Sequence, residues 1–129
     1  MSVRGAEEGH AVWPRPGRLD VWYDTVTDPV SGYGFWLHHE LVSPTDGSPP
    51  YTHGWVAAFP PGEAPLLHRF GPRPLVPGPR FACGDVVSNA GRREGSAGPA
   101  RWMLTHTQTS APLYTFDRAA RERRLLPAA

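Results

Sequence analysis

Two side chains that can exchange protons lie two residues apart in this sequence. His38 and Glu40 follow Trp36 with one residue between each pair. Residues two apart in a strand project from the same face, so an imidazole, a carboxylate and an aromatic ring would lie side by side. Such a group suits hydration of a double bond: one side chain protonates carbon, the ring stabilises the carbocation and the other side chain activates water. We predict His38 and Glu40 as catalytic residues; the alternative is a cross-strand polar pair.

The aromatic residues are the richest feature of the chain. Large rings bury much surface and can line a cavity for an apolar molecule, although packing in a core is the alternative use. In a β-barrel the two uses merge, because interior side chains either fill the lumen or leave room for one ligand. The predicted ligand-binding residues are Trp22, Trp36, Trp55, Trp102, Tyr23 and Phe59.

A metal site is a second possible use of the polar residues. Two imidazoles and a carboxylate drawn from His38, His53, His106 and Glu40 would suit a facial triad. However, adjacent histidines such as His38 and His39 point to opposite faces of a strand, and the chain has no His-x-His or His-Glu-x-x-His motif. We therefore predict no metal and no cofactor.

Composition excludes several classes of mechanism. All 13 basic residues are arginine, so neither a Schiff-base lysine nor a phosphate-binding P-loop lysine exists. The net charge of +1 predicts no nucleic-acid partner, and the arginines of residues 118–124 fit the solvated face of a helix. Cys83 is the single cysteine and has no catalytic pattern around it, which favours a small buried hydrophobe and a reducing compartment. With no apolar stretch of membrane-spanning length and no signal-peptide core in residues 1–10, we predict a cytoplasmic protein without a membrane span.

Apolar and polar residues alternate with a period of two through most of the chain, which predicts strands. The strands expected are residues 19–26, 34–43, 51–59, 65–70, 81–88, 100–109 and 112–116. Residues 28–32 predict a turn that makes a hairpin of the first two strands. Residues 71–80 hold four prolines and residues 89–99 are polar and glycine-rich, so both are expected to be loops. Asp117 is expected to cap a short helix over residues 118–126.

Both faces of the segment 34–43 are partly apolar, which fits a barrel wall better than a sheet with one face in water. The predicted fold class is therefore all-β: an antiparallel, lipocalin-like, partly open barrel with a short C-terminal helix. Residues 1–18 are expected to be a flexible lead-in, and residues 19–129 a single barrel domain.

Four segments carry a resemblance to a known family. Residues 21–29 read VWYDTVTDP and residues 32–37 read GYGFWL, while ARWML at 100–104 and the segment 116–127 look like the end of a barrel. Together they make the chain resemble the AttH-like proteins related to carotenoid hydratase (hydroxyneurosporene synthase). The resemblance implies a lipocalin-like barrel and apolar ligands. Proteins of that group usually carry two tandem barrels, and this chain resembles the first only.

The resemblance does not fix a reaction, because the related proteins include polyene hydratases and cyclases that close rings pericyclically. We expect a lipocalin-like protein that binds an apolar polyene or polyketide, and the enzyme classes left open are a hydratase or other lyase and a cyclase. The alternative is a non-catalytic barrel half that serves as a structural or interaction domain for a missing second barrel. The expected partners are the apolar ligand and either a second copy of the chain or a second barrel.

Overall fold

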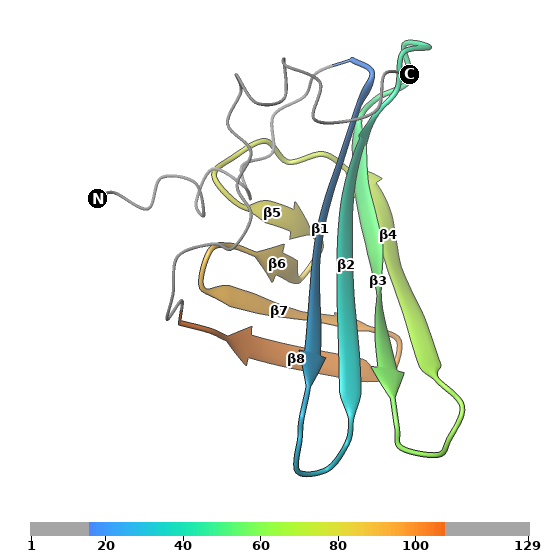
Figure 1. Cartoon of the computed structure of the whole chain (residues 1–129). Coiled ribbons are helices and arrows are strands. Elements are labelled where there is room, and N and C mark those ends of the chain that lie inside the picture. Colours follow the sequence, from blue (N-terminus) through green and yellow to red (C-terminus); the bar gives the residue numbers. More distant parts are fainter. Residues whose placement is uncertain (1–15, 108–129) are drawn as a thin grey trace, which may run out of the picture.

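The computed structural model describes residues 16–107, and every element in that part of the chain is a β-strand (Figure 1). The strands are β1 (Arg18–Thr27), β2 (Gly34–Ser43), β3 (Tyr51–Phe59), β4 (Leu66–Pro74), β5 (Phe81–Cys83), β6 (Val86–Ser88), β7 (Arg92–Ala97) and β8 (Ala100–Thr105). They form two antiparallel sheets with strand orders β1-β2-β3-β4 and β5-β6-β7-β8. Within residues 16–107, no helix of the length and apolarity needed to cross a membrane is found.

The first sheet is built from long hairpins. The predicted turn between β1 and β2 is confirmed: the Gly32 amide donates to the Asp28 carbonyl at 2.8 Å, and Gly32 has a φ of +78°. The Asp28 carboxylate accepts hydrogen bonds from the Val30 amide at 3.0 Å and from the Ser31 hydroxyl. Hydrogen bonds between the Asp28 side chain and the backbone and side chain of the following residues hold the turn in one conformation. The turn then fixes the register of β1 against β2.

The loops predicted over residues 71–80 and 89–99 were wrong in part, because each contains residues of a strand. β4 continues into the proline-rich segment as far as Pro74. This is possible because β4 is an edge strand, and the missing N–H of a proline is tolerated where it would face the side without a neighbouring strand. Residues Arg92–Ala97 form β7 instead of a loop, because the tight turn at Gly98, with a φ of +56°, folds them back on β8.

The single strand predicted over residues 81–88 is also a correction. It is two short strands, β5 and β6, which pair across a turn at Gly84 with Cys83 opposite Val86. Gly84 has a φ of +63°, in the left-handed region that glycine adopts without a steric penalty.

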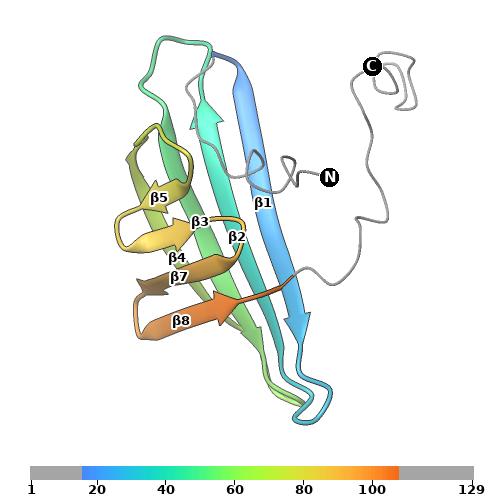
Figure 2. The same ribbon diagram turned by 90° about the vertical axis from the view of Figure 1, so that its left-hand side faces the viewer.

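The strands of the second sheet run across those of the first (Figures 1 and 2), and the core lies between the two layers. Leu37 and Leu41 of β2 and Phe70 of β4 pack there against Phe81 and Val86 of the second sheet. We call this side of the β1–β4 sheet the inner face. Side chains alternate along each strand, so the neighbouring residues lie on the opposite side, the outer face, which is turned away from β5–β8.

The all-β, antiparallel prediction is confirmed for the described residues. Within them, no ladder of hydrogen bonds joins the two sheets, so the sheets are stacked layers and do not close into one barrel. The predicted strand over residues 112–116, the predicted helix over residues 118–126 and most of the predicted lead-in lie outside the described residues.

Candidate functional site

The outer face of the β1–β4 sheet brings the two predicted catalytic residues together. His38 and Glu40 both project from it, as predicted from their spacing. On the neighbouring strand β3, Trp55 lies opposite His38 and His53 lies opposite Glu40. The antiparallel register therefore adds a second imidazole and a second indole ring to the pair, and we call His38, Glu40 and His53 the His–Glu–His cluster.

Glu40 joins the two histidines of the cluster. Its Oε1 is 2.8 Å from Nε2 of His38, and its Oε2 is 2.7 Å from Nε2 of His53. An ionised carboxylate can only accept hydrogen bonds, so each imidazole donates a hydrogen from Nε2. A shared carboxylate therefore fixes the orientation and the tautomer of both rings, in the way that a buried aspartate orients a catalytic histidine.

The cluster is only partly open to water. The side chains of His38, Glu40 and His53 are 10%, 18% and 24% exposed. Burial raises the pKa of Glu40, but the hydrogen bonds and positive charge of His38 and His53 outweigh that effect, and the net pKa lies below its ordinary value of 4.5. Glu40 is therefore a carboxylate across the physiological range of pH.

Aromatic rings surround the cluster. The imidazole of His38 stacks on Trp55, with ring centres 4.0 Å apart and planes 7° from parallel. The Trp36 ring lies nearly perpendicular to the same imidazole, with ring centres 5.3 Å apart. His53 lies between Tyr51 and Trp55. The stacked Trp55 ring covers one face of the His38 imidazole, and reduced contact with water strengthens the hydrogen bond between His38 and Glu40.

Four of the six predicted ligand-binding residues share the outer face. Trp36 and Trp55 are half-buried beside the cluster, while Tyr23 of β1 and the terminal residue of β3, Phe59, are exposed. The prediction placed all six aromatic residues around one ligand, but the other two lie elsewhere. Trp22 and Trp102 pack against the core between the sheets.

The guanidinium of Arg69 on β4 also belongs to this face. Its central carbon lies 5.8 Å from the centre of the Trp55 ring, and Arg69 is paired in register with Trp55. An arginine over an indole face gains cation–π attraction while its donors stay available to a ligand anion or carbonyl.

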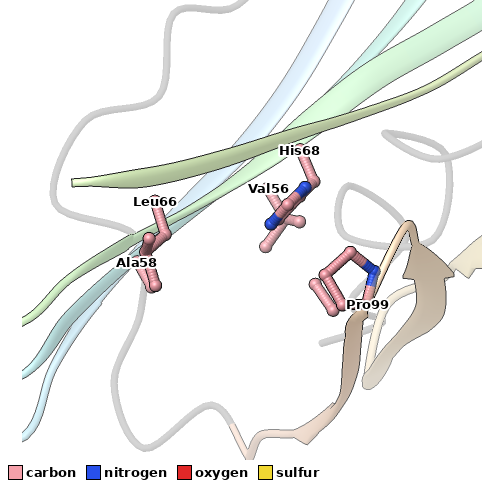
Figure 3. A pocket seen from close by; sticks show the side chains of 6 residues that line it. Val56, Ala58, Leu66, His68 and Pro99 are labelled. Carbon is pink, nitrogen blue, oxygen red and sulfur yellow. The ribbon is translucent and has the colours of Figure 1, made fainter.

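A hollow lies on the other side of the same sheet, at one end of the space between the two layers (Figure 3). Its volume is about 200 Å³. The lining residues are Val56, Ala58, Leu66, His68, Pro99 and Ala100. None of the residues predicted to bind a ligand is among them, and the volume is below the 300–1,000 Å³ or so typical of small-molecule sites.

The alternative metal site is not assembled. Within residues 16–107, no group of three histidine, cysteine or carboxylate side chains is arranged to hold a metal ion. Both cluster imidazoles direct Nε2 at Glu40, and His106 follows β8 in the other sheet. Cys83 is buried in the core as predicted; burial raises the pKa of its thiol, and the thiol donates a weak hydrogen bond to the carbonyl of Thr52.

His53 is the site residue that sequence reasoning did not assign to catalysis. The spacing of His38 and Glu40 shows that they share a face of one strand, but it says nothing about the strand beside them. The pairing of Glu40 with His53 depends on the length and geometry of the connection over residues 44–50. If the register of β2 against β3 had been deduced from that connection, His53 would have been placed opposite Glu40 and so identified as a site residue.

Comparisons with known proteins identify relatives of unknown activity. The chain is similar to two proteins of Mycobacterium tuberculosis, uncharacterized protein MT0513 of strain CDC 1551 / Oshkosh and uncharacterized protein Rv0493c of strain ATCC 25618 / H37Rv, with 47% identity to each over 116 residues. The match covers 88% of this chain but 35% of each relative, so the chain spans about a third of the length of the curated relatives it matches. No protein-family model matches the chain, and no solved structure matches it significantly.

Proposed function

We propose that this chain is an all-β module of two stacked sheets that binds an apolar small molecule of polyene or polyketide type on the outer face of the β1–β4 sheet. We further propose that the His–Glu–His cluster transfers protons to or from that molecule, in a reaction of the hydratase or cyclase class. The observation that carries the proposal is the single carboxylate of Glu40 bonded to both imidazoles at 2.8 and 2.7 Å. Proton-transfer residues are commonly oriented by such a second hydrogen bond.

The surroundings of the cluster support an apolar ligand. Half-buried indole rings flank the histidines, and exposed apolar side chains extend the same face in both directions, with Tyr23 65% and Leu67 55% exposed. A face with this much accessible apolar surface gains free energy when a ligand removes it from water, at about 25 cal/mol per Å². The resemblance to AttH-like proteins and carotenoid hydratase points to the same class of ligand.

A second candidate function rests on a separate observation. The relatives contain about twice as much additional polypeptide as the segment matched here, and an apolar sheet face is a suitable surface for a further domain. In this second reading the chain is a structural or interaction module, and another domain covers the outer face in place of a ligand. The ligand experiment described next separates the two.

The test uses diphenylhexatriene, an apolar polyene whose fluorescence rises when it leaves water. We expect saturable binding to the full chain and at least tenfold weaker binding to Trp36→Ala, which removes an indole from the outer face. The matched control is Leu66→Ala, which changes the lining of the hollow on the inner side and should bind as the unaltered chain does. Absence of saturable binding would favour the interaction module, and loss of binding in Leu66→Ala alone would place the ligand between the sheets.

A further inference from the structure

The two imidazoles of the cluster are not equivalent. His38 Nδ1 is buried and has no hydrogen-bond partner in the described part of the chain. A hydrogen on that atom would be a buried donor without an acceptor, which is costly. The favoured neutral form of His38 therefore carries its hydrogen on Nε2, where Glu40 accepts it. A ligand cannot reach the bare Nδ1, because the ring is covered by Trp55 and Trp36.

His53 has the same bond to Glu40 but a different exposure. Its side chain is 24% exposed, against 10% for His38. Unlike Nδ1 of His38, Nδ1 of His53 is not a buried atom without a hydrogen-bond partner. With Nε2–H donated to Glu40, the Nδ1 lone pair of His53 remains available to a molecule lying on the outer face. Glu40 then stabilises the positive charge that the ring acquires when it accepts a proton.

From this asymmetry we infer that His53 is the catalytic base of the site, that Glu40 and His38 are positioning residues, and that the substrate is an apolar carbonyl compound with an acidic C–H bond. The inference rests on the proposed ligand site. It narrows the ligand from a polyene or polyketide to one that carries a carbonyl group, and it excludes hydration of an isolated double bond from the reactions proposed above. It moves the base from His38, the residue predicted from sequence, to its neighbour across the sheet.

The carbonyl requirement follows from the acids available. Glu40 is the only carboxyl group on the described strands of the outer face, and it is held in its ionised form. An imidazolium ion is far too weak an acid to protonate an isolated double bond. Removal of a proton beside a carbonyl group is within reach of an imidazole base, since the carbonyl oxygen accepts the charge.

The proton-transfer step balances without another reactant. The C–H bond beside the carbonyl breaks, its proton forms an N–H bond at His53 Nδ1, and the electron pair moves onto the carbonyl oxygen to give an enolate. The imidazolium is then paired with the Glu40 carboxylate. Arg69, which lies over Trp55 on the same face, supplies a positive charge for the enolate oxygen. Return of the proton to carbon completes the cycle and leaves the carbonyl compound intact or isomerised.

The experiment uses 2-tetralone, an apolar ketone with acidic protons beside its carbonyl group. Binding to the full chain is measured first by quenching of tryptophan fluorescence, and exchange of the ketone protons for deuterium is then followed by NMR in D₂O. We expect the chain to accelerate exchange over buffer and His53→Gln to reduce the acceleration about 100-fold, the size of a general-base contribution. His106→Gln, an exposed histidine beyond β8, is the matched control and should keep the full rate.

The positioning roles have their own readouts. Glu40→Gln should lower the exchange rate and also move the hydrogen of His53 between its ring nitrogens, whereas Glu40→Asp should restore part of the rate. His38→Gln should cost about tenfold, less than loss of the base itself. Binding of 2-tetralone without accelerated exchange, or exchange unchanged in His53→Gln, would overturn the inference and leave the ligand site standing. Absence of binding would refute the ligand site and this inference together.

Discussion

At the scale of single residues, the His–Glu–His cluster depends on the acceptor capacity of Glu40. A carboxylate offers two equivalent oxygens, and each accepts one imidazole N–H at normal hydrogen-bond length. The amide of glutamine has nearly the same shape but only one oxygen, and its other terminal group is a donor. Glutamine at this position therefore cannot accept hydrogen bonds from both imidazole N–H groups with separate oxygens.

We predict that Glu40→Gln forces one imidazole to change tautomer. The change should fall on His53, because a hydrogen on His38 Nδ1 would be buried without an acceptor. Long-range ¹H–¹⁵N NMR distinguishes the tautomers: both rings should carry the hydrogen on Nε2 in the unaltered chain, and His53 should carry it on Nδ1 in the variant. If His38 changed instead, the assignment of His38 as the sealed ring would be wrong.

A pH dependence of stability follows from the lowered pKa of Glu40. Its pKa is lower in the folded chain than in the unfolded chain, so the ionised form favours folding. The stabilisation is complete above the unfolded value of about 4.5 and is lost as the pH falls through the folded value. Urea unfolding between pH 6 and pH 3 should show a smaller loss of stability for Glu40→Gln than for the unaltered chain. Parallel curves for the two proteins would contradict this coupling.

At the scale of elements, β2, β3 and β4 approach one another closely at Gly54. This close approach keeps His38 and Glu40 of β2 beside His53 of β3. Gly54 lies opposite His39, and a Cβ atom at Gly54 would come within 1.9 Å of the His38 carbonyl oxygen and 2.5 Å of the Phe70 ring. Neither neighbour can move easily, because one is backbone and the other is part of the core. The absence of a side chain at Gly54 therefore allows β2 and β3 to carry His38, Glu40 and His53 on adjacent strands.

Gly54→Ala should destabilise the fold by about 3 kcal/mol, at the upper end of overpacking costs. Gly78→Ala is the matched control, since a Cβ atom there would meet nothing within 4 Å, and its effect should stay within about 0.5 kcal/mol. The two variants are compared by urea unfolding of the full chain. Equal stabilities would show that the sheet accommodates a side chain at Gly54 without strain.

The same elements show what the sequence could predict. Alternation of apolar and polar residues located β1, β2 and β3 within a residue or two, because their apolar side chains fall on a fixed side of the sheet. β7 was mistaken for a loop because its residues are mostly polar or small, and its strand conformation depends on pairing with β8 across the turn at Gly98. For the site, period-two spacing placed His38 and Glu40 together, but His53 required a register that no single strand encodes.

At the scale of the whole molecule, one ion pair ties the two layers together. The Nε of Arg93 on β7 donates to the Asp24 carboxylate on β1 at 2.8 Å, and the Arg93 side chain is only 7% exposed. Arg93 also donates to the carbonyl of Asn89. A buried guanidinium needs its acceptors, so the pair aligns the second sheet against the first even though a buried ion pair adds little net stability over an apolar contact.

Asp24→Ala should therefore destabilise the fold by about 1–3 kcal/mol, because it removes an acceptor from a buried arginine. Arg92→Ala breaks an exposed pair with Glu94 and should cost less than about 1 kcal/mol. Thermal unfolding of the two variants gives the comparison. A cost for Arg92→Ala as large as that for Asp24→Ala would mean that burial does not govern these pairs.

The central claim is that the outer face of the β1–β4 sheet, and not the space between the sheets, receives an apolar ligand. The most direct measurement is ¹H–¹⁵N NMR of the full chain titrated with 2-tetralone. We expect the largest shifts at the Trp36 and Trp55 indoles and at the His53 imidazole, with little change around the hollow. Shifts concentrated at Val56, Leu66 and Ala100, or no saturable shift at any residue, would contradict it.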